Sequence, residues 1–392
     1  MTERPLSGFT SVRARASFWL FAVATFACFT TNSMLALLSV VLKKQGLSPD
    51  LIGIVLAAPA PSILITMLLA GPLITRFGAL QVARTGALIM LMSYLSFDLT
   101  VDTFFGAMSS RIGHGVGYAL FMPAAMIYAD SNLSGQHKLY YFGIYASMFP
   151  LPNVLGPPLA EAYLQRFGVD RFFLYTALPA LLGIALVFAV TPTLKASVSR
   201  AALIDYVHLL RRRSLWIPYG GIFVVGMFYG LVVSFMALLL ESRRVPVSYF
   251  FVTFTICLFG SRFLLVRYIQ ALPRAVIFAT GLGLLSGAYL LLALDATASA
   301  TVAAGILFGL GYSVAYPTLS VWVTQQFGPD KQGMPLTLYN AIFTLGIFIL
   351  PLIGGYVIAW LGIQRMVLGM AFGGLVAIVL IWLANQTRRQ PD

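Results

Sequence analysis

Residues 104–123 read FFGAMSSRIGHGVGYALFMP, an apolar stretch with a single charge, Arg111. The stretch is long enough to cross a bilayer as a helix, because about 20 apolar residues span the hydrocarbon core. Arg262 lies in a second such run, FFVTFTICLFGSRFLLV at 250–266. A guanidinium inside a span costs roughly 2.5–3.5 kcal/mol even on the most lenient scale, so such charges usually face a watery path or a polar partner. The two arginines therefore predict a transporter rather than a passive membrane anchor.

The composition places the chain in lipid. Of its 392 residues, 59% are hydrophobic and 9% are charged, whereas a soluble domain carries about 25% charged residues. The apolar runs are continuous rather than alternating, which favours spanning helices over a closed barrel. The net charge of +13 is attributed to basic cytoplasmic loops, and no nucleic-acid partner is expected.

Runs of about 20 apolar residues predict an all-α integral membrane protein with twelve transmembrane helices. The only sizeable polar segment, 192–214, is basic and divides them into six and six. We therefore expect an N-terminal six-helix bundle (1–191), a cytoplasmic linker (192–214) and a C-terminal six-helix bundle (215–392). The expected spans are 16–42, 51–73, 82–101, 104–128, 139–163, 172–191, 215–240, 247–267, 274–294, 300–324, 333–360 and 363–385.

The loop charges predict the orientation. With both termini inside, sixteen Lys and Arg residues fall on the cytoplasmic side and seven outside. Cytoplasmic loops carry the excess of Lys and Arg, so we expect a multi-pass protein of the cell (inner) membrane with both termini cytoplasmic.

The two halves resemble each other at an ungapped shift of 194 residues. The shift places Gly115-Val-Gly117-Tyr118 on Gly309-Leu-Gly311-Tyr312 and Pro123 on Pro317. It also pairs Tyr145 with Tyr339, Phe149 with Phe343 and Pro157 with Pro351. We interpret this as two pseudo-symmetric repeats, which in transporters place the substrate near mid-membrane.

Twelve spans, a basic central loop and parallel repeats resemble the major facilitator superfamily over the whole chain. Arg111-Ile-Gly-His-Gly115-Val-Gly117 is similar to the family's Arg-x-x-x-Gly-x-Gly pattern. Gly156-Pro157 resembles the core of the glycine-proline motif of proton-coupled antiporters. Gly71-Pro-Leu-Ile-Thr-Arg76-Phe-Gly78 resembles the loop signature between spans two and three. The resemblance implies that Gly71, Arg76, Gly78, Gly115, Gly117, Gly156 and Pro157 serve conformational change.

The motifs also depart from the family patterns. Thr75 stands at the aspartate position of the loop signature, while Ala160 and Glu161 replace two glycines of the glycine-proline motif. These losses weaken the expectation of a typical drug–proton antiporter. Gly-Ser-Arg262 in the eighth span is similar to arabinose- or sugar-efflux-type members, but that likeness covers one helix.

The fourth span carries the main candidate site. At 3.6 residues per turn, Arg111, His114 and Tyr118 share one helix face. Arg111 either contacts substrate or tunes a proton site, or else it is a structural residue that pins backbone carbonyls of a neighbouring span. His114 either binds a transported proton, since its ordinary pKa of about 6.5 suits that role, or is a satisfied hydrogen-bonding residue.

Arg262 either faces the central cavity or snorkels toward the cytoplasm. In the first case Arg111 and Arg262 form a clamp for an anion, because guanidinium matches carboxylate geometry. Other proton-site candidates are Glu161 and Asp98, each alternatively a solvated span end. Further substrate-binding candidates are polar or aromatic residues of the spans, each alternatively a packing residue: Asn32, Tyr118, Tyr145, Tyr312, Tyr339 and Asn340.

The leading prediction is a secondary active transporter that exports a small organic solute by alternating access, coupled to protons. The alternative is uptake or exchange of an organic anion, such as a carboxylate or siderophore, held by Arg111 and Arg262. A non-transporting receptor on the same fold is the third reading. No nucleotide-binding loop, metal-ligand cluster or nucleophile elbow is present in the sequence, so we expect no enzyme, cofactor or metal. The expected partners are the solute, protons and lipid, and the expected state is a monomer.

Overall fold

The computed structural model describes residues 8–191, 208–264, 272–328 and 333–387. Among them are ten helices long and apolar enough to cross a membrane, which confirms the predicted all-α membrane class. The chain separates into two compact units. Unit 1 comprises Met1–Leu35 and Ala58–Arg200, and unit 2 comprises Ala36–Ala57 and Ala201–Asp392. The predicted linker 192–214 lies largely outside the described residues, so its role stays a prediction.

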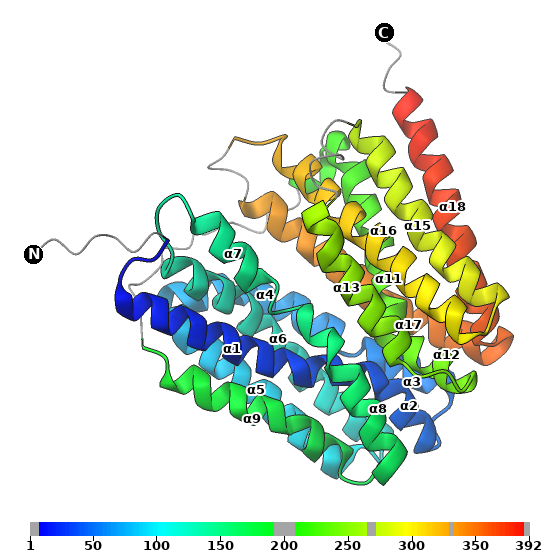
Figure 1. Cartoon of the computed structure of the whole chain (residues 1–392), viewed down its shortest axis with the longest axis horizontal. Helices are drawn as coiled ribbons and strands as arrows, with labels where there is room; N and C mark the ends of the chain where they lie inside the picture. Colours follow the sequence, from blue (N-terminus) through cyan, green and yellow to red (C-terminus); the bar gives the residue numbers. More distant parts are fainter. Residues whose placement is uncertain (1–7, 192–207, 265–271, 329–332, 388–392) are drawn as a thin grey trace, which may run out of the picture. The chain divides into compact units, whose positions relative to one another are not determined.

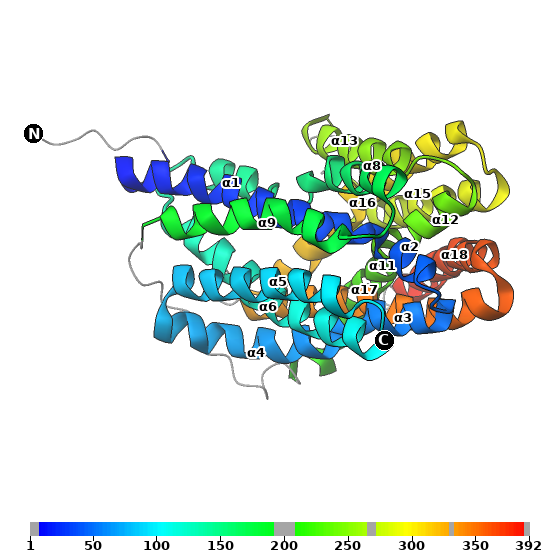
Figure 2. The same cartoon turned by 90° about the horizontal axis from the view of Figure 1, so that it is seen from below.

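Unit 1 is a bundle in which α1 lies beside α9, α9 beside α5, α5 beside α6, and α6 beside α4 (Figures 1 and 2). The long helices of this unit are apolar over most of their length, so we expect neighbouring helices to cover one side of each and lipid the other. Its helices are α1 (Val12–Met34), α4 (Pro59–Phe77), α5 (Ala79–Thr100), α6 (Phe104–Ser131), α7 (Lys138–Ala146), α8 (Gly156–Phe167) and α9 (Phe172–Ala189).

Glycines let α6 approach its neighbours closely. A Cβ atom at Gly117 would lie 2.6 Å from the Met90 nitrogen and 2.8 Å from the Gly86 oxygen on α5. A Cβ at Gly115 would lie 3.0 Å from Pro59 on α4. Small residues at such contacts allow backbone-to-backbone packing in membranes, and this packing fixes the rotation of α6 and hence the direction of its polar face.

The predicted fifth span, 139–163, is not one helix. It comprises α7, a 3₁₀ turn at Leu151–Val154 and α8. Pro150 and Pro152 lie at this interruption, and Gly156-Pro157 opens α8. Proline removes a backbone donor and clashes with the preceding turn, so a break here is the expected consequence of the sequence.

Close glycine contacts of unit 1 recur in unit 2. On α16, a Cβ at Gly311 would lie 2.7 Å from the Gly281 oxygen of α15, and one at Gly309 would lie 2.5 Å from the Phe254 oxygen of α13. The predicted eighth span appears as α13, which leads into residues outside the described part. The helices are α2 (Leu38–Lys44), α3 (Pro49–Ala57), α11 (Trp216–Ser234), α12 (Met236–Ser242), α13 (Ser248–Leu264), α15 (Arg274–Leu294), α16 (Ala298–Thr324), α17 (Gly333–Leu361) and α18 (Ile363–Thr387).

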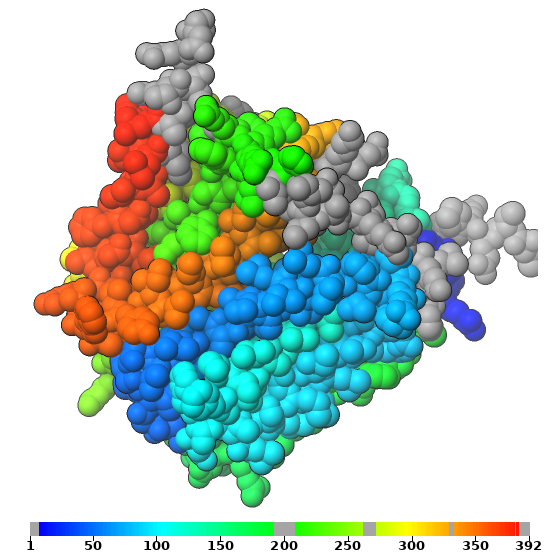
Figure 3. Space-filling view, turned by 180° about the vertical axis from the view of Figure 1, so that it is seen from behind, coloured from blue at the N-terminus to red at the C-terminus, as the bar shows by residue number. Residues whose placement is uncertain are grey.

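The segment Ala36–Ala57 belongs to unit 2 although its neighbours in sequence belong to unit 1. Both of its ends coincide with a break in a helix, the 3₁₀ turn Leu35–Leu37 and the turn at Ala58 before Pro59. A Cβ at Gly355 of α17 would lie 2.9 Å from the Cα of Gly53 on α3. The two backbones are therefore in contact, and Figure 3 shows this blue segment against the orange α17.

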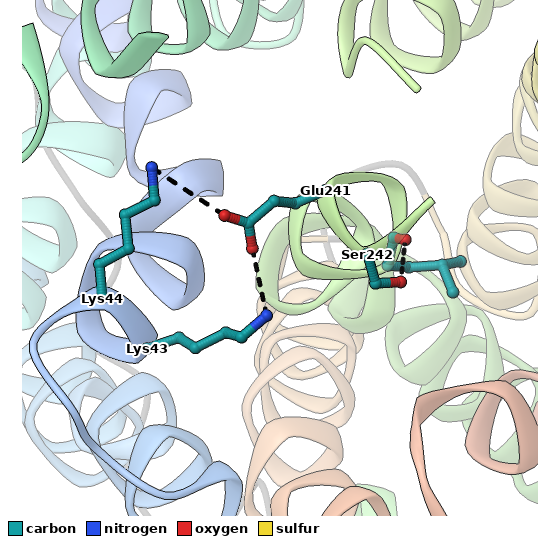
Figure 4. A network of polar contacts seen from close by, with 5 residues as sticks. Lys43, Lys44, Glu241 and Ser242 are labelled. Atoms are coloured by element: carbon teal, nitrogen blue, oxygen red, sulfur yellow. Dashed lines mark hydrogen bonds and ion pairs between the residues drawn. The ribbon is translucent and has the colours of Figure 1, made fainter. Parts of the chain in front are cut away.

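Charges reinforce the attachment of this segment. The Glu241 carboxylate at the end of α12 lies 3.4 Å from Lys43 Nζ and 4.0 Å from Lys44 Nζ at the end of α2 (Figure 4). All three side chains are partly exposed, and exposed ion pairs contribute only about 0–1 kcal/mol. The glycine contact is therefore the larger constraint on the segment.

Candidate functional site

The polar face of α6 lies inside unit 1. Arg111 is 7% exposed and His114 is 4% exposed, while Tyr118, one turn further along, is half-buried. The three residues follow one another at helical spacing, as predicted. A buried guanidinium requires polar surroundings, so this face is specialised rather than ordinary packing.

Arg111 and His114 contact each other directly. Arg111 Nη1 lies 3.4 Å from His114 Nδ1. A guanidinium only donates hydrogen bonds, so Nδ1 accepts and we infer that the ring proton of a neutral His114 sits on Nε2. Nε2 is buried and has no hydrogen-bond partner among the described residues. His114 Nε2 is thus a buried hydrogen-bond donor that finds no acceptor in the part of the chain that the structure describes.

Tyr94 on α5 joins this pair. Its ring centroid lies 5.2 Å from that of His114, and the ring is fully buried. Within the described residues its hydroxyl also has no hydrogen-bond partner. The His114 ring lies 6.3 Å from that of Tyr118. Arg111, His114 and Tyr94 therefore form one cluster, called here the donor cluster.

The donor cluster suits a negatively charged group. An unsatisfied buried donor costs about 1–3 kcal/mol, and hydrogen bonds from cationic donors to a carboxylate are about twice as strong as neutral ones. A carboxylate entering the cluster would accept from His114 Nε2 and the Tyr94 hydroxyl, for which the described residues offer no acceptor. The donor cluster can also bind a proton, at the His114 imidazole.

In unit 2 the predicted residues Tyr312, Tyr339 and Asn340 lie on the neighbouring helices α16 and α17. Tyr312 and Asn340 are half-buried, whereas Tyr339 is fully buried. The Tyr339 hydroxyl donates to the Tyr316 carbonyl oxygen at 2.5 Å, and the Tyr316 hydroxyl donates to Asn340 Oδ1 at 2.7 Å. These bonds tie the two helices together and orient the amide of Asn340.

Tyr145, the repeat counterpart of Tyr339, is buried in a similar way. Its hydroxyl lies 2.9 Å from Thr25 Oγ1 on α1, and the Thr25 hydroxyl donates to the Phe21 carbonyl oxygen. Both tyrosines are fully buried. The geometry describes a packing role, and substrate binding by Tyr145 or Tyr339 stays a prediction. Asn32, half-buried on α1, also stays a predicted substrate ligand.

The remaining charged candidates are dispersed. Asp98 on α5 and Glu161 on α8 are half-buried, and their proton roles stay predictions. Arg262 belongs to the last turn of α13, but its side chain lies outside the described part of the structure. The predicted clamp of Arg111 and Arg262 is therefore a hypothesis only.

The motif residues occupy turns and close contacts. Gly78 connects α4 to α5 with φ +87°, a conformation that side chains rarely adopt. Thr75, at the aspartate position of the signature, donates to the Gly71 carbonyl oxygen at 3.1 Å, and Arg76 lies over the Phe77 ring at 5.1 Å. A Cβ at Gly156 would collide with the Ser33 hydroxyl of α1. Conformational roles for these residues remain proposals.

Sequence reasoning missed Tyr94. It lies between Ser93 and Ser96 in an otherwise apolar span, and this local polarity was the only available signal. It also missed Tyr229 on α11, whose ring stacks on Tyr312 with centroids 5.2 Å apart, because an isolated tyrosine in an apolar run carries no pattern.

Comparisons with known proteins place the chain in a class. The family model described as Major Facilitator Superfamily matches residues 18–294 and 245–392. The chain belongs to the major facilitator superfamily, and it is a secondary transporter rather than an enzyme.

The chain is also similar to two curated relatives and to a solved structure, all of them transporters. The chain is 23% identical to the staphylopine export protein of Staphylococcus aureus, over 88% of this chain and 89% of that protein. It is 25% identical to the uncharacterized transporter YhhS of Escherichia coli, over 61% of this chain and 57% of that protein. A mutant of the nucleoside transporter NupG has a TM-score of 0.79 at 14% identity, covering 94% of this chain and 99% of that one. Such a distant structural likeness shows the fold alone.

Proposed function

We propose that this transporter exports a small organic anion and that the donor cluster binds its negative group. The observation that carries the proposal is the pair of buried donors, His114 Nε2 and the Tyr94 hydroxyl, which lack acceptors among the described residues and lie beside the Arg111 guanidinium. An anionic oxygen supplies what such donors need. The Arg111 guanidinium in the same cluster repels a cationic solute.

Export is the proposed direction because a relative that aligns over 88% of this chain and 89% of its own length is, by its name, an export protein. Coupling to protons is part of the proposal, with His114 as the first candidate carrier. An imidazole in contact with a guanidinium changes its proton affinity when an anion arrives, so anion and proton binding are linked at one place. Uptake or exchange through the same site is the second candidate, and the proposed orientation keeps both termini cytoplasmic.

The binding test compares ligand-induced stabilisation of the purified protein by succinate, benzoate, glucose and tetraphenylphosphonium. A ligand at 100 times its Kd adds about 2.7 kcal/mol to the apparent stability. We expect stabilisation by the two carboxylates only. In Arg111→Met the carboxylate affinity should fall about 10- to 150-fold, since a hydrogen bond to a charged group contributes about 1.5–3 kcal/mol.

Two controls make the test specific. Tyr94→Phe should also weaken carboxylate binding, whereas Tyr289→Phe, which alters a fully buried tyrosine of unit 2, should not. The ligand-free Arg111→Met protein should lose no more than about 1 kcal/mol, while a structural pin would cost about 3–5 kcal/mol. Carboxylate stabilisation that persists in Arg111→Met would refute the anion site.

Transport direction and coupling need proteoliposomes. Efflux of radiolabelled benzoate, followed with and without an imposed pH gradient, should accelerate with the gradient in wild type. His114→Gln keeps an N–H donor in the side chain but cannot take up a proton, so it should keep most of the benzoate binding and lose the acceleration. An unchanged response to the gradient in His114→Gln would remove His114 as the proton carrier without affecting the anion site.

A further inference from the structure

Three helices of unit 2 meet at one end of the unit, where α11 and α15 begin and α16 ends. Both α11 and α15 pack against α16 (Figure 1). A Cβ atom at Gly221, in the second turn of α11, would lie 2.9 Å from Phe278 Cζ on α15 and 3.2 Å from Leu319 Cδ1 on α16. Phe278 lies one turn into α15 and Leu319 lies in the last turns of α16, so the three helix ends are close together.

Arginines mark this end of the three helices. Arg211, Arg212 and Arg213 come shortly before α11, Arg274 is the first residue of α15, and all four are exposed. The two candidate membrane spans at this end start at Arg213 and at Arg274. Their charges therefore lie where the hydrocarbon core ends and the lipid headgroups begin. We call these four arginines the basic end.

The end of α16 holds two of these arginines in place. The guanidinium carbon of Arg212 lies 4.9 Å from the centroid of the Phe327 ring, and the Arg274 guanidinium donates to Gln325 Oε1. Gln325 and Phe327 are two residues apart in the chain. The charges of Arg212 and Arg274 therefore come together from two different helices.

Exposed apolar side chains adjoin the basic end. Trp216, in the first turn of α11, is 58% exposed, and its indole N–H donates to the Leu210 carbonyl oxygen at 2.9 Å. Leu272 and Val276 lie two residues to either side of Arg274 and are also exposed. Tryptophan is enriched at the level of the lipid headgroups. This part of unit 2 thus combines cationic donors with apolar surface.

The opposite end of unit 2 uses its charges within the protein. Arg243, which follows α12, donates to the carbonyl oxygens of Asp295 and Leu292 at the end of α15. The Glu241 carboxylate lies beside the two lysines at the end of α2. Because carboxylates share this end with the cations, it attracts an anionic ligand less strongly than the basic end does.

We propose that the basic end binds an anionic phospholipid, with the phosphate at Arg212 and Arg274 and the acyl chains along the exposed apolar side chains. Guanidinium suits this group because its planar fork donates two hydrogen bonds to one phosphate. In the proposed orientation the basic end faces the cytoplasm, the side on which basic residues beside a span recognise anionic lipid. The inference lies within unit 2 and is independent of the proposed solute site.

The test follows thermal unfolding of the full-length protein in detergent with three additives. These are dioleoylphosphatidylglycerol, the zwitterionic dioleoylphosphatidylcholine with the same chains, and glycerol 3-phosphate, which has no chains. Phosphatidylglycerol alone should stabilise wild type. Arg274→Gln should raise its apparent Kd about 5-fold and Arg212→Gln/Arg274→Gln about 25-fold, the ratios expected for one and two basic residues near an anionic surface. Native mass spectrometry, which counts lipids on the folded protein, makes the same comparison for a variant of lower stability.

Arg365→Gln is the matched control. Arg365 is exposed at the start of α18, next to Gln364, whose Nε2 donates to the Ala293 carbonyl oxygen at the far end of α15 from Arg274. The variant removes the same charge from the opposite end, so it should bind phosphatidylglycerol as wild type does. An equal loss in Arg365→Gln, equal stabilisation by both lipids, or none by phosphatidylglycerol would overturn the proposal. Stabilisation by glycerol 3-phosphate as strong as that by phosphatidylglycerol would assign the basic end to a free phosphate and also overturn it.

Discussion

The fourth and tenth spans, α6 and α16, share a backbone framework and carry different chemistry. Gly117 packs α6 onto α5 as Gly311 packs α16 onto α15, and Gly115 and Gly309 fill the corresponding places toward α4 and α13. Where α6 presents Arg111 and His114, however, α16 presents Gly305 and Phe308. The comparison teaches that the repeat preserves close helix contacts, while the residues between them are free to differ.

The largest expected effect tests whether the two frameworks are equivalent. In Gly117→Ala the new Cβ would lie 2.6 Å from the Met90 nitrogen, and in Gly311→Ala 2.7 Å from the Gly281 oxygen. Because backbone atoms cannot move aside, each change should lower the free energy of unfolding by about 1–3 kcal/mol. Thermal unfolding in detergent measures both variants.

Gly287→Ala on α15 is the control for this pair. A Cβ there meets nothing within 4 Å, so the variant should be as stable as wild type or gain about 0.5–1 kcal/mol from helix propensity. If Gly311→Ala behaved like Gly287→Ala while Gly117→Ala did not, the two frameworks would not be equivalent.

This framework was largely predictable from the sequence. The apolar runs fixed most spans because each helix must satisfy its backbone internally across the membrane, and the 194-residue shift paired Gly115 and Gly117 with Gly309 and Gly311 before any contact was known. The family and the helical class are confirmed. The sequence did not predict that Ala36–Ala57 packs in unit 2. An apolar run does not indicate which bundle its residues contact.

The candidate sites were less predictable than the framework. Arg111 and His114 stood out because a charge inside a span is costly. Tyr94 and Tyr229 did not, since a tyrosine is common in spans and its role depends on partners from other helices. Pairing across helices is a tertiary property, and spacing within one helix reveals only which residues share a face.

A smaller effect on stability is expected at the N-terminal caps of α6 and α16. Thr103 and Thr297 are equivalent at the 194-residue shift, and each side chain accepts a backbone hydrogen bond at 3.2 Å, from Gly106 and Ala300 respectively. Replacing either threonine by alanine should cost about 1 kcal/mol, the usual value of an N-cap. Thermal unfolding of both variants measures the cost, with Ser substitutions as controls that keep the cap. A large difference between the two alanine variants would show that the repeat does not extend to these caps.

The smallest effect concerns a charge that only unit 2 has at this place. Asp295 Oδ1 accepts the Thr297 N–H at 2.8 Å, whereas Val101 occupies the equivalent position in unit 1. That backbone hydrogen bond, the Thr297 hydroxyl and the nearby Arg243 hold the pKa of Asp295 below its ordinary 3.8.

A carboxylate whose pKa is lower in the folded than in the unfolded state stabilises the fold at pH values above its unfolded-state pKa. This contribution is lost as the pH falls through the folded-state pKa. Unfolding temperatures of wild type and Asp295→Asn should therefore differ slightly at pH 7 and converge as the pH falls below about 4. A difference that stayed constant from pH 7 to pH 3 would mean that the carboxylate charge contributes nothing to the cap, and that the two helix starts are held by their threonines alone.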